Sequence, residues 1–282
     1  MTKDDKITIA AIQMCSRQNR DENLATVRVL LEEAAQRGAQ IIALPENFSY
    51  VGYESEMITV AEDPDTSSII RFLTSFASKH KVAIIGGSIP LKNSGISKVT
   101  NTCLVINHEG RIVARYDKLH LFDVRLDDRT MITESRYVEA GSRVVTADLF
   151  GLKVGLSICY DLRFPELYRA LVMQGANIIF VPAAFTMQTG NDHWEVLLRA
   201  RAIENQCYIV APAQIGQHNA DRISYGRALI VDPWGQVMTQ CQDKEGVIVS
   251  EIDLDFLEKV RNRLPCLAHI RRDKFFPPVA LG

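Results

Sequence analysis

The sequence has no long block of one charge. Its 282 residues include 32 basic and 34 acidic side chains, which gives a formal net charge of −2. The basic side chains are dispersed, and Arg271-Arg272 near the C-terminus is a short pair of the kind found on a solvated surface or at an interface. Because nucleic-acid-binding domains gather basic residues on one face, the composition does not indicate nucleic acid as a partner.

The chain also lacks a segment that predicts a membrane span or a signal peptide. A long uncharged stretch covers residues 170–191, but Gln174, Gly175 and Pro182 interrupt it. The N-terminal residues carry charges of both signs before a short apolar run, without a basic region or a small-residue cleavage site. We therefore expect no membrane partner and a cytoplasmic location.

Paired cysteines are absent as well. The six cysteines stand apart from one another, with no CxxC pair and no Cys/His spacing typical of a metal site; they are Cys15, Cys103, Cys159, Cys207, Cys241 and Cys266. A chain of this length does not need disulfides for stability, so the pattern predicts reduced thiols in a reducing compartment.

The apolar residues that are present predict one α/β domain over residues 1–282. Hydrophobic residues make up 47% of the chain, enough for a large core. We expect this core over residues 6–255, with a C-terminal helix and tail over 253–282 at an interface. Periodicity and turn residues predict helices at 21–37, 67–80, 166–174, 192–205 and 253–263, strands at 7–13, 41–44, 82–86, 154–158, 178–181, 208–213 and 247–252, hairpins at 102–116 and 228–240, and a functional loop at 119–142.

Two internal similarities indicate that the domain has two related halves. The segment GAQIIALPENF at 38–48 is similar to GANIIFVPAAF at 175–185, and LVINHEG at 104–110 is similar to LIVDPWG at 229–235. We infer pseudo-two-fold halves rich in β-α-β units. A sheet-on-sheet core covered by helices, an α-β-β-α sandwich of four layers, fits this pattern.

Cys159 lies between a predicted strand and a predicted helix. The run 154–158 is apolar, and Pro165 and Glu166 are typical of a helix start. Backbone N–H groups at such a junction favour a thiolate and can hold an oxyanion, here through the Tyr160 N–H. The alternative is that Cys159 is a small buried core residue, which is common for cysteine.

Glu46 and Lys118 also follow predicted strands, and with Cys159 they make a chemical set. A base activates a thiol nucleophile, and a cation stabilises the oxyanion. Burial would raise the pKa of Glu46 and suit it to act as base and then acid. The equivalent of Glu46 in the second half is Ala183, so the fold itself does not require a carboxylate there. Alternatively Glu46 caps a helix, Lys118 is a solvated cation, or His120 or His193 pairs with the cysteine.

Three blocks carry a resemblance to a known family. LPEN at 44–47, YDKLHLFD at 116–123 and SICYDLRFPE at 157–166 resemble the signature blocks of the nitrilase superfamily of carbon–nitrogen hydrolases, and the resemblance runs from about residue 6 to about 272. It implies an α-β-β-α fold, a catalytic triad of Glu46, Lys118 and Cys159, support of the lysine by Glu134, and a homodimer or larger homo-oligomer. It implies no metal and no other cofactor.

Further blocks are similar to one branch of that superfamily. HWEVLLRARAIE at 193–204, SYG at 224–226 and DPWG at 232–235 look like the deaminated glutathione amidases. The resemblance implies hydrolysis of the amide of a small carboxylate-bearing substrate through a cysteine thioester, giving 2-oxoglutarate and cysteinylglycine. Alternatives are an omega-amidase acting on α-ketoglutaramate or α-ketosuccinamate, a nitrile hydrolase or acyltransferase, and a non-catalytic member that binds a metabolite or partner. We expect Arg163, Phe185 and Thr186 to contact the substrate.

Overall fold

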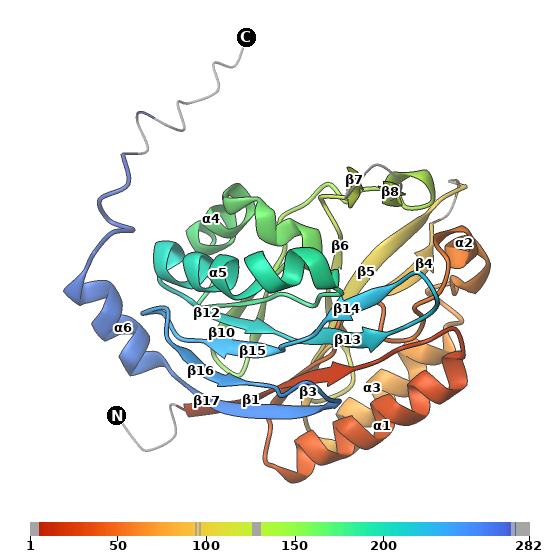
Figure 1. Ribbon diagram of the computed structural model, residues 1–282. Helices are drawn as coiled ribbons and strands as arrows, with labels where there is room; N and C mark the ends of the chain where they lie inside the picture. The colour runs from red at the N-terminus through yellow and green to blue at the C-terminus, as the bar shows by residue number, and fades with distance from the viewer. Residues whose placement is uncertain (1–5, 94, 96, 126–130, 272–273, 275–282) are drawn as a thin grey trace.

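The structure is a computed structural model that describes residues 6–93, 95, 97–125, 131–271 and 274. Two β-sheets pack face to face, and helices cover the outer face of each sheet (Figure 1). The predicted α-β-β-α sandwich is confirmed. The predicted extended tail with Pro277-Pro278 lies outside the described residues.

The first sheet is built mainly from the N-terminal half. Its elements are β1 (Lys6–Met14), α1 (Arg20–Gln36), β2 (Ile41–Ala43), η1 (Glu54–Glu56), α2 (Met57–Val60), α3 (Ser68–His80), β3 (Ala83–Ile85), β4 (Ile89–Lys92), β5 (Val99–Ile106) and β6 (Ile112–Asp117). Three strands from the C-terminal half complete this sheet: β13 (Ala213–Gln217), β14 (Ile223–Tyr225) and β17 (Gly246–Asp253). The strand order is β14-β13-β1-β2-β3-β5-β4, with β6 paired to β5 and β17 paired to β1. The helices α1 and α3 lie along its outer face (Figure 1).

The second sheet comes from the C-terminal half. The chain first forms the small hairpin β7 (Asp123–Arg125) and β8 (Met131–Thr133) and the turn η2 (Glu134–Arg136). It continues through β9 (Thr146–Leu149), β10 (Leu152–Leu156), η3 (Cys159–Arg163), α4 (Pro165–Met173), β11 (Ile178–Phe180), α5 (Met187–Asn205), β12 (Tyr208–Ala211), β13 (Ala213–Gln217), β14 (Ile223–Tyr225), β15 (Leu229–Val231), β16 (Val237–Gln240), β17 (Gly246–Asp253) and α6 (Leu254–Arg263). The strand order is β16-β15-β12-β11-β10-β9.

The two halves repeat one topology. In the first, β1, β2 and β3 are parallel and connected through helices, and β5 and β6 follow as antiparallel strands. In the second, β10, β11 and β12 are parallel in the same way, and β15 and β16 follow. Glu46 lies three residues after the end of β2, and Ala183 lies three residues after the end of β11. The predicted pseudo-two-fold relation and the equivalence of these positions are confirmed.

Alternation of side chains along β1 divides the core into two parts. Ile9 and Ala11 join the cluster between the two sheets, whereas Ala10 and Ile12 join the cluster under α1 and α3. Successive strand residues point to opposite faces, so a strand covered on both faces is apolar throughout. This is why the apolar pattern of the strand is continuous in the sequence.

Two expected boundaries are wrong. The sequence predicts a loop up to Asn191, but α5 begins at Met187, where the Thr186 side chain caps the helix by accepting from the Thr189 N–H. The first turns, MQTGN, are polar and contain Gly190, so apolar periodicity does not reveal them. The strand predicted over 208–213 breaks at Pro212, and β13 crosses to the first sheet beside β1.

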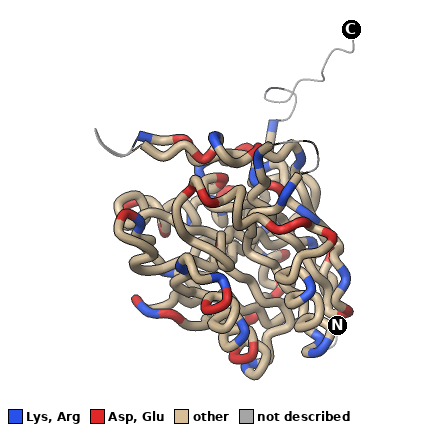
Figure 2. The backbone as a smooth tube through the Cα atoms, turned by 90° about the vertical axis from the view of Figure 1, so that its right-hand side faces the viewer, with Lys and Arg blue, Asp and Glu red and all other residues tan. Residues whose placement is uncertain are grey.

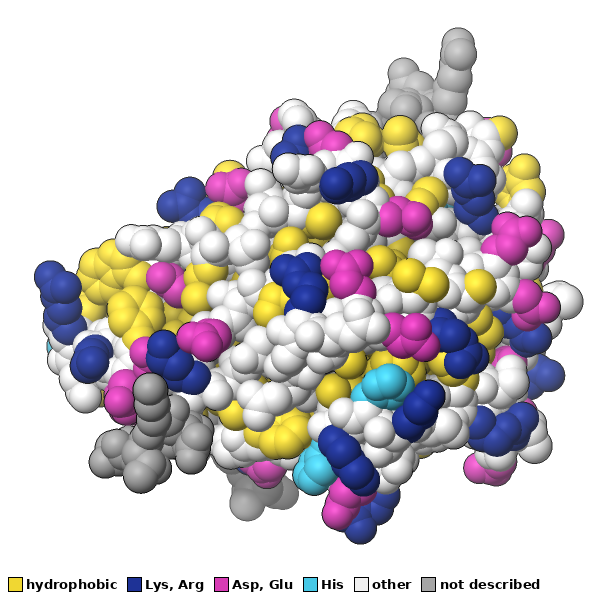
Figure 3. Space-filling view, turned by 90° about the horizontal axis from the view of Figure 1, so that it is seen from below, with side chains coloured by type: hydrophobic (Ala, Val, Ile, Leu, Met, Phe, Trp, Pro, Cys, Tyr) yellow, Lys and Arg dark blue, Asp and Glu magenta, His cyan; other side chains and the backbone are white. Residues whose placement is uncertain are grey.

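The helix α6 is attached to the core. Leu257 is buried, and the Arg261 guanidinium donates to the carbonyl oxygens of Gln206 (3.1 Å) and Ala176 (3.2 Å). That the segment 253–282 forms an interface stays a prediction. Basic and acidic positions alternate along the backbone without a large block of one sign (Figure 2). On the face seen in Figure 3, charged side chains of both signs lie among scattered hydrophobic ones. Within the described ranges, no helix has the length and apolar character to cross a bilayer.

Candidate active site

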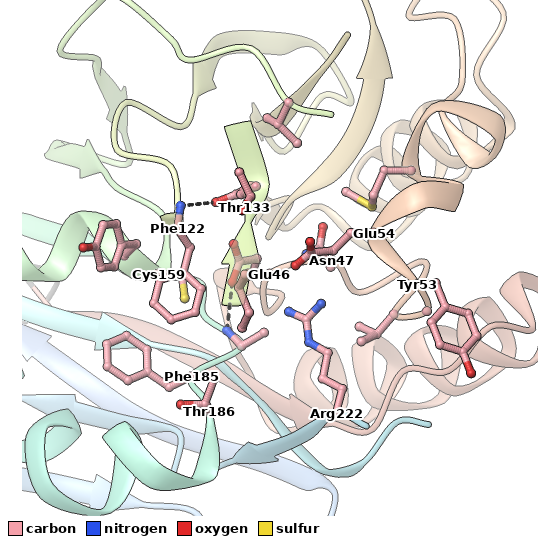
Figure 4. A pocket seen from close by; sticks show the side chains of 18 of the residues that line it. Glu46, Asn47, Tyr53, Glu54, Phe122, Thr133, Cys159, Phe185, Thr186 and Arg222 are labelled. Atoms are coloured by element: carbon pink, nitrogen blue, oxygen red, sulfur yellow. Dashed lines mark hydrogen bonds between the residues drawn. The ribbon is translucent and has the colours of Figure 1, made fainter. Parts of the chain in front are cut away.

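A cavity of about 790 Å³ opens where strands of both sheets end. The eight residues predicted to act in catalysis or substrate binding all line it; these are Glu46, Lys118, Glu134, Cys159, Tyr160, Arg163, Phe185 and Thr186. Figure 4 shows Glu46, Cys159, Phe185 and Thr186 among the side chains around it. The tertiary structure thus gathers into one cavity side chains that are up to 140 positions apart in the sequence, as the numbers 46 and 186 show.

Unusual backbone conformations place the central groups. Cys159 is the first residue of η3 and has φ 48°, and Asn47 after Glu46 has φ 54°. Residues other than glycine avoid this left-handed region, which costs about 1–2 kcal/mol. Hydrogen bonds hold the Cys159 turn: its N–H donates to the Pro182 carbonyl (2.9 Å), and the Ile158 N–H donates to Asp161 Oδ2 (2.8 Å). The turn exposes the cysteine side chain to the cavity.

Lys118 lies between two carboxylates. Its Nζ donates to Glu46 Oε1 at 3.0 Å and to both oxygens of Glu134 at 2.9 and 3.1 Å. The Lys118 side chain is 2% exposed. A buried ammonium needs such partners to offset its lost hydration. Although burial alone lowers the pKa of Lys118, the charges of Glu134 and Glu46 outweigh it and raise the pKa well above 10.5.

Glu46 is held by donors on both carboxylate oxygens. Besides Lys118, Asn101 Nδ2 donates to Oε1 (3.0 Å), and the Ala184 N–H donates to Oε2 (3.0 Å). The Cys159 thiol lies near enough to this carboxylate to help lower its pKa. Asn101 reaches Glu134 as well (3.2 Å), and so connects the two acids that flank the lysine. The carboxylate is therefore fixed and points toward the sulfur.

The expected raised pKa of Glu46 is wrong. Burial does raise it, and burial is the largest single influence, but the Lys118 cation and the hydrogen bonds from Cys159 and Lys118 together hold the pKa below its ordinary value of 4.5. Sequence reasoning counted the burial of Glu46 without the cation that is buried with it. At neutral pH Glu46 is a carboxylate and can accept a proton.

The expectation that the strand end favours a thiolate is also wrong. Burial raises the pKa of Cys159 well above 9.0, and the negative charge of Glu46 raises it further, against the smaller opposing effect of Lys118. The resting arrangement is a neutral thiol next to a carboxylate. Such a pair reacts by transfer of the thiol proton to the carboxylate as the sulfur attacks, without a standing thiolate.

The two histidines have other partners. His120 Nδ1 lies 2.7 Å from Asp161 Oδ1, and its ring stacks on Phe164 with centroids 3.6 Å apart. His193 Nδ1 lies 3.2 Å from the Arg163 guanidinium. Neither histidine lines the cavity. The geometry therefore favours Glu46 over a histidine as the base for Cys159.

The arginines near the site differ in their contacts. Arg163 packs over the rings of Phe185 (5.3 Å) and Tyr160 (5.9 Å) at the cavity wall. Arg201 is buried and donates to the Leu162 carbonyl (3.0 Å), and Arg199 donates to the Gly235 carbonyl (2.8 Å). Their spacing on one helix predicts that at most one of Arg199 and Arg201 points toward the site, and neither lines the cavity.

Sequence reasoning missed several residues of the site. Asn101 lies in the middle of β5, and only its polarity within a buried strand could have indicated it. Glu54 also lines the cavity. Burial raises the pKa of Glu54, and the smaller effect of the nearby Arg222 cation is to lower it. Arg222 projects into the cavity on the side of Glu54 (Figure 4). No sequence signal marks it, because the loop reaches the site only through the crossing of β13.

The pKa directions predict a pH profile. If Glu46 is the base that the geometry favours, its carboxylate form is required, and kcat/KM should fall only as the pH drops through a value below 4.5. Lys118 and Cys159 add no alkaline limb below about pH 9 because their pKa values are raised above 10.5 and 9.0. Because the folded-state pKa of Glu46 is lowered, its stabilising effect is present above 4.5 and is lost with falling pH over the same range.

The profile is measured as kcat/KM from about pH 3.5 to 9.5, with circular dichroism at each pH to separate unfolding from protonation. An acid limb centred at about pH 6–7 in folded protein would show that the pKa of Glu46 is raised and would contradict this interpretation.

The chain is similar to known carbon-nitrogen hydrolases in sequence and in structure. The family model described as carbon-nitrogen hydrolase matches residues 8–262. The deaminated glutathione amidase of Synechocystis sp. is 46% identical over 264 residues, which cover 92% of this chain and 96% of that protein. The crystal structure of the Caenorhabditis elegans NitFhit protein superposes with a TM-score of 0.90 at 38% identity, covering 95% of this chain and 66% of that longer one. The structure of Saccharomyces cerevisiae Nit3, a member of branch 10 of the nitrilase superfamily, gives a TM-score of 0.85 at 29% identity, with coverage of 95% and 97%.

Proposed function

Because the chain belongs to the carbon-nitrogen hydrolase family, we propose that it is an amidase whose substrate is deaminated glutathione and whose catalytic residues are Glu46, Lys118 and Cys159. The observation that carries the proposal is the buried contact of Lys118 with Glu46 beside the neutral Cys159 thiol, within one open cavity. A structural ion pair alone would not require a strained cysteine facing the cavity next to it.

The first half of the reaction forms a thioester. The Cys159 sulfur attacks the amide carbonyl carbon while the S–H proton moves to Glu46. The negative charge that develops on the carbonyl oxygen is stabilised by the Lys118 ammonium and the Tyr160 backbone N–H. Glu46 then gives its proton to the amide nitrogen, the C–N bond breaks, and the amine leaves.

The second half releases the acid. Glu46, again a carboxylate, takes a proton from a water molecule that attacks the thioester carbonyl. The new tetrahedral oxyanion occupies the same position near Lys118. When it collapses, the C–S bond breaks and Glu46 returns the proton to sulfur. The free enzyme is restored, and each proton transfer uses the one carboxylate that the structure holds beside the thiol.

Glu134 has a positioning role in this proposal. Its two oxygens accept from Lys118 and its Oε2 also accepts from the Phe122 N–H (2.6 Å). These contacts keep Lys118 charged and direct its ammonium to one place. Preorganised charge of this kind needs no rearrangement when the oxyanion forms.

The lining of the cavity supports a small anionic substrate. Arg163 on the wall beside Phe185 can pair with a substrate carboxylate, while Phe185 and Thr186 contact the chain of the acid. This is consistent with the similarity to deaminated glutathione amidases. The cytoplasmic location, the homo-oligomeric state and the single-domain boundaries remain predictions.

A substrate panel tests the proposal. We expect kcat/KM for deaminated glutathione to exceed that for α-ketoglutaramate by at least about tenfold, since a leaving group that adds binding contacts lowers the barrier further. The products, 2-oxoglutarate and cysteinylglycine, are quantified by mass spectrometry, with a simple nitrile as a control substrate. A preference for α-ketoglutaramate would assign an omega-amidase instead. Absence of turnover, together with no covalent adduct on Cys159, would favour a non-catalytic binding protein.

A further inference from the structure

Arg222 lines the cavity and has no role in the proposed mechanism. It lies between β13 and β14, and its backbone is fixed: its N–H donates to Asn219 Oδ1 (2.9 Å), and its carbonyl accepts from the His218 N–H (2.9 Å). The side chain extends from this loop into the cavity (Figure 4). A held backbone with an inward side chain is the arrangement expected of a binding group.

The Arg222 guanidinium has no ion pair or hydrogen bond with another of the described residues, although it lies close enough to lower the pKa of both Glu46 and Glu54. Arg163, by contrast, packs over two aromatic rings and has His193 Nδ1 at 3.2 Å from its Nη1. A guanidinium offers five N–H donors in a planar fork that matches a carboxylate. An arginine that faces a cavity with these donors open is suited to an anionic ligand.

An acceptor lies on the same side of the cavity. Asn47 is 6% exposed and its buried Oδ1 has no hydrogen-bond donor in the part of the chain that the structure describes. Asn47 and Arg222 are neighbours in the view of Figure 4, and both line the cavity. Buried polar atoms are nearly always paired, so this unpaired acceptor on a residue of the cavity wall can take a donor that the ligand supplies. A peptide N–H is such a donor.

The chemistry of Glu46 determines which half of the substrate meets these groups. Glu46 gives a proton to the leaving nitrogen, so the amine half of the substrate lies on the side of Glu46. Arg222 acts electrostatically on Glu46, whereas Phe185 lies on the other side of Glu46 in Figure 4. Arg163 packs over the ring of Phe185 and so belongs to that end of the cavity. The cavity therefore has a cation at each end, with the reacting groups between them.

We propose that Arg222 binds a carboxylate in the amine half of the substrate, with Asn47 accepting from a peptide N–H there, so that the cavity selects amides whose leaving group is a short peptide with a free C-terminus. The inference rests on the proposed function and identifies what distinguishes a peptide-like amide from a primary amide at this site. A primary amide releases ammonia and leaves Arg222 unpaired.

The experiment compares deaminated glutathione with the same molecule whose C-terminal carboxylate is capped as a carboxamide. In the wild-type protein we expect kcat/KM for the free acid to exceed that for the capped form by roughly 10- to 100-fold, the range for a charge-assisted hydrogen bond. In Arg222→Ala this ratio should fall to near 1, mainly through a higher KM for the free acid. Arg222→Lys should give an intermediate ratio, since it keeps the charge and loses the fork.

Two controls make the outcome specific. Arg71→Ala removes an exposed arginine of α3 outside the cavity and should leave the ratio as in the wild type. Any effect of the Arg222 charge on Glu46 acts on all substrates alike and cancels in the ratio. A ratio in Arg222→Ala equal to that of the wild type would overturn the inference.

A binding arm separates the inference from the proposed function. Calorimetry measures binding of deaminated glutathione to Cys159→Ala and to Cys159→Ala/Arg222→Ala, where no turnover is needed. A loss of roughly 10- to 100-fold in affinity on adding the second substitution supports the carboxylate contact, even if the wild-type protein hydrolyses none of the probes and the proposed function fails. Equal affinities would refute the contact, whatever the turnover.

Discussion

Replacement of Cys159 by alanine is expected to lower kcat by about 10⁵- to 10⁶-fold while the protein stays folded, which is the scale seen when a catalytic nucleophile is removed. The reason is that the proposed reaction passes through a covalent thioester. Without the sulfur no thioester forms, and Glu46 has no thiol proton to accept. The protein should stay folded because alanine keeps the Cβ and removes only the sulfur, and Cys159 lines an existing cavity. Alanine at φ 48° carries backbone strain like that of cysteine.

The measurement combines single-turnover kinetics with thermal unfolding, and mass spectrometry of acid-quenched protein to detect the acyl group on Cys159. Cys207→Ala is the matched control, since Cys207 is a buried cysteine with a pKa raised by burial to about 12, and it does not line the cavity. That variant should keep its turnover. Activity of Cys159→Ala within tenfold of the wild type would exclude the proposed nucleophile.

Replacement of Lys118 by methionine is expected to have the largest combined effect on activity and stability. Methionine fills a similar volume but leaves the carboxylates of Glu46 and Glu134 without the cation between them. Breaking a buried ion pair by removing one partner costs about 3–5 kcal/mol. Loss of the oxyanion donor should lower kcat by about 10²- to 10³-fold.

A double variant separates the two effects. In Lys118→Met/Glu134→Gln one of the facing charges is gone, so stability in urea should recover in part while kcat stays low. The single variant should also gain stability on lowering the pH toward 5, because without the cation burial raises the folded-state pKa of Glu46 and protonation relieves the unpaired charge. Wild-type stability in Lys118→Met would contradict the proposed ion-pair network.

The sequence by itself determined the architecture to a large extent. Continuous apolar runs such as 41–44 and 178–181 indicate strands covered on both faces, and the similarity of 38–48 to 175–185 indicates two related halves. The comparison of Glu46 with Ala183 across those halves points to a carboxylate that the fold does not need. These signals are local, because periodicity and strand ends depend on near neighbours in the chain.

The tertiary structure alone decided the protonation of the site and the extent of the cavity. Whether burial raises or lowers the pKa of Glu46 depends on Lys118, which is 72 residues away in the sequence and 3.0 Å away in space. Arg222 enters the cavity because β13 leaves β12 at Pro212 and pairs with β1 in the other sheet. Pairing between distant strands and the electrostatics of groups buried together are properties of the packed chain, and local sequence carries no signal for either.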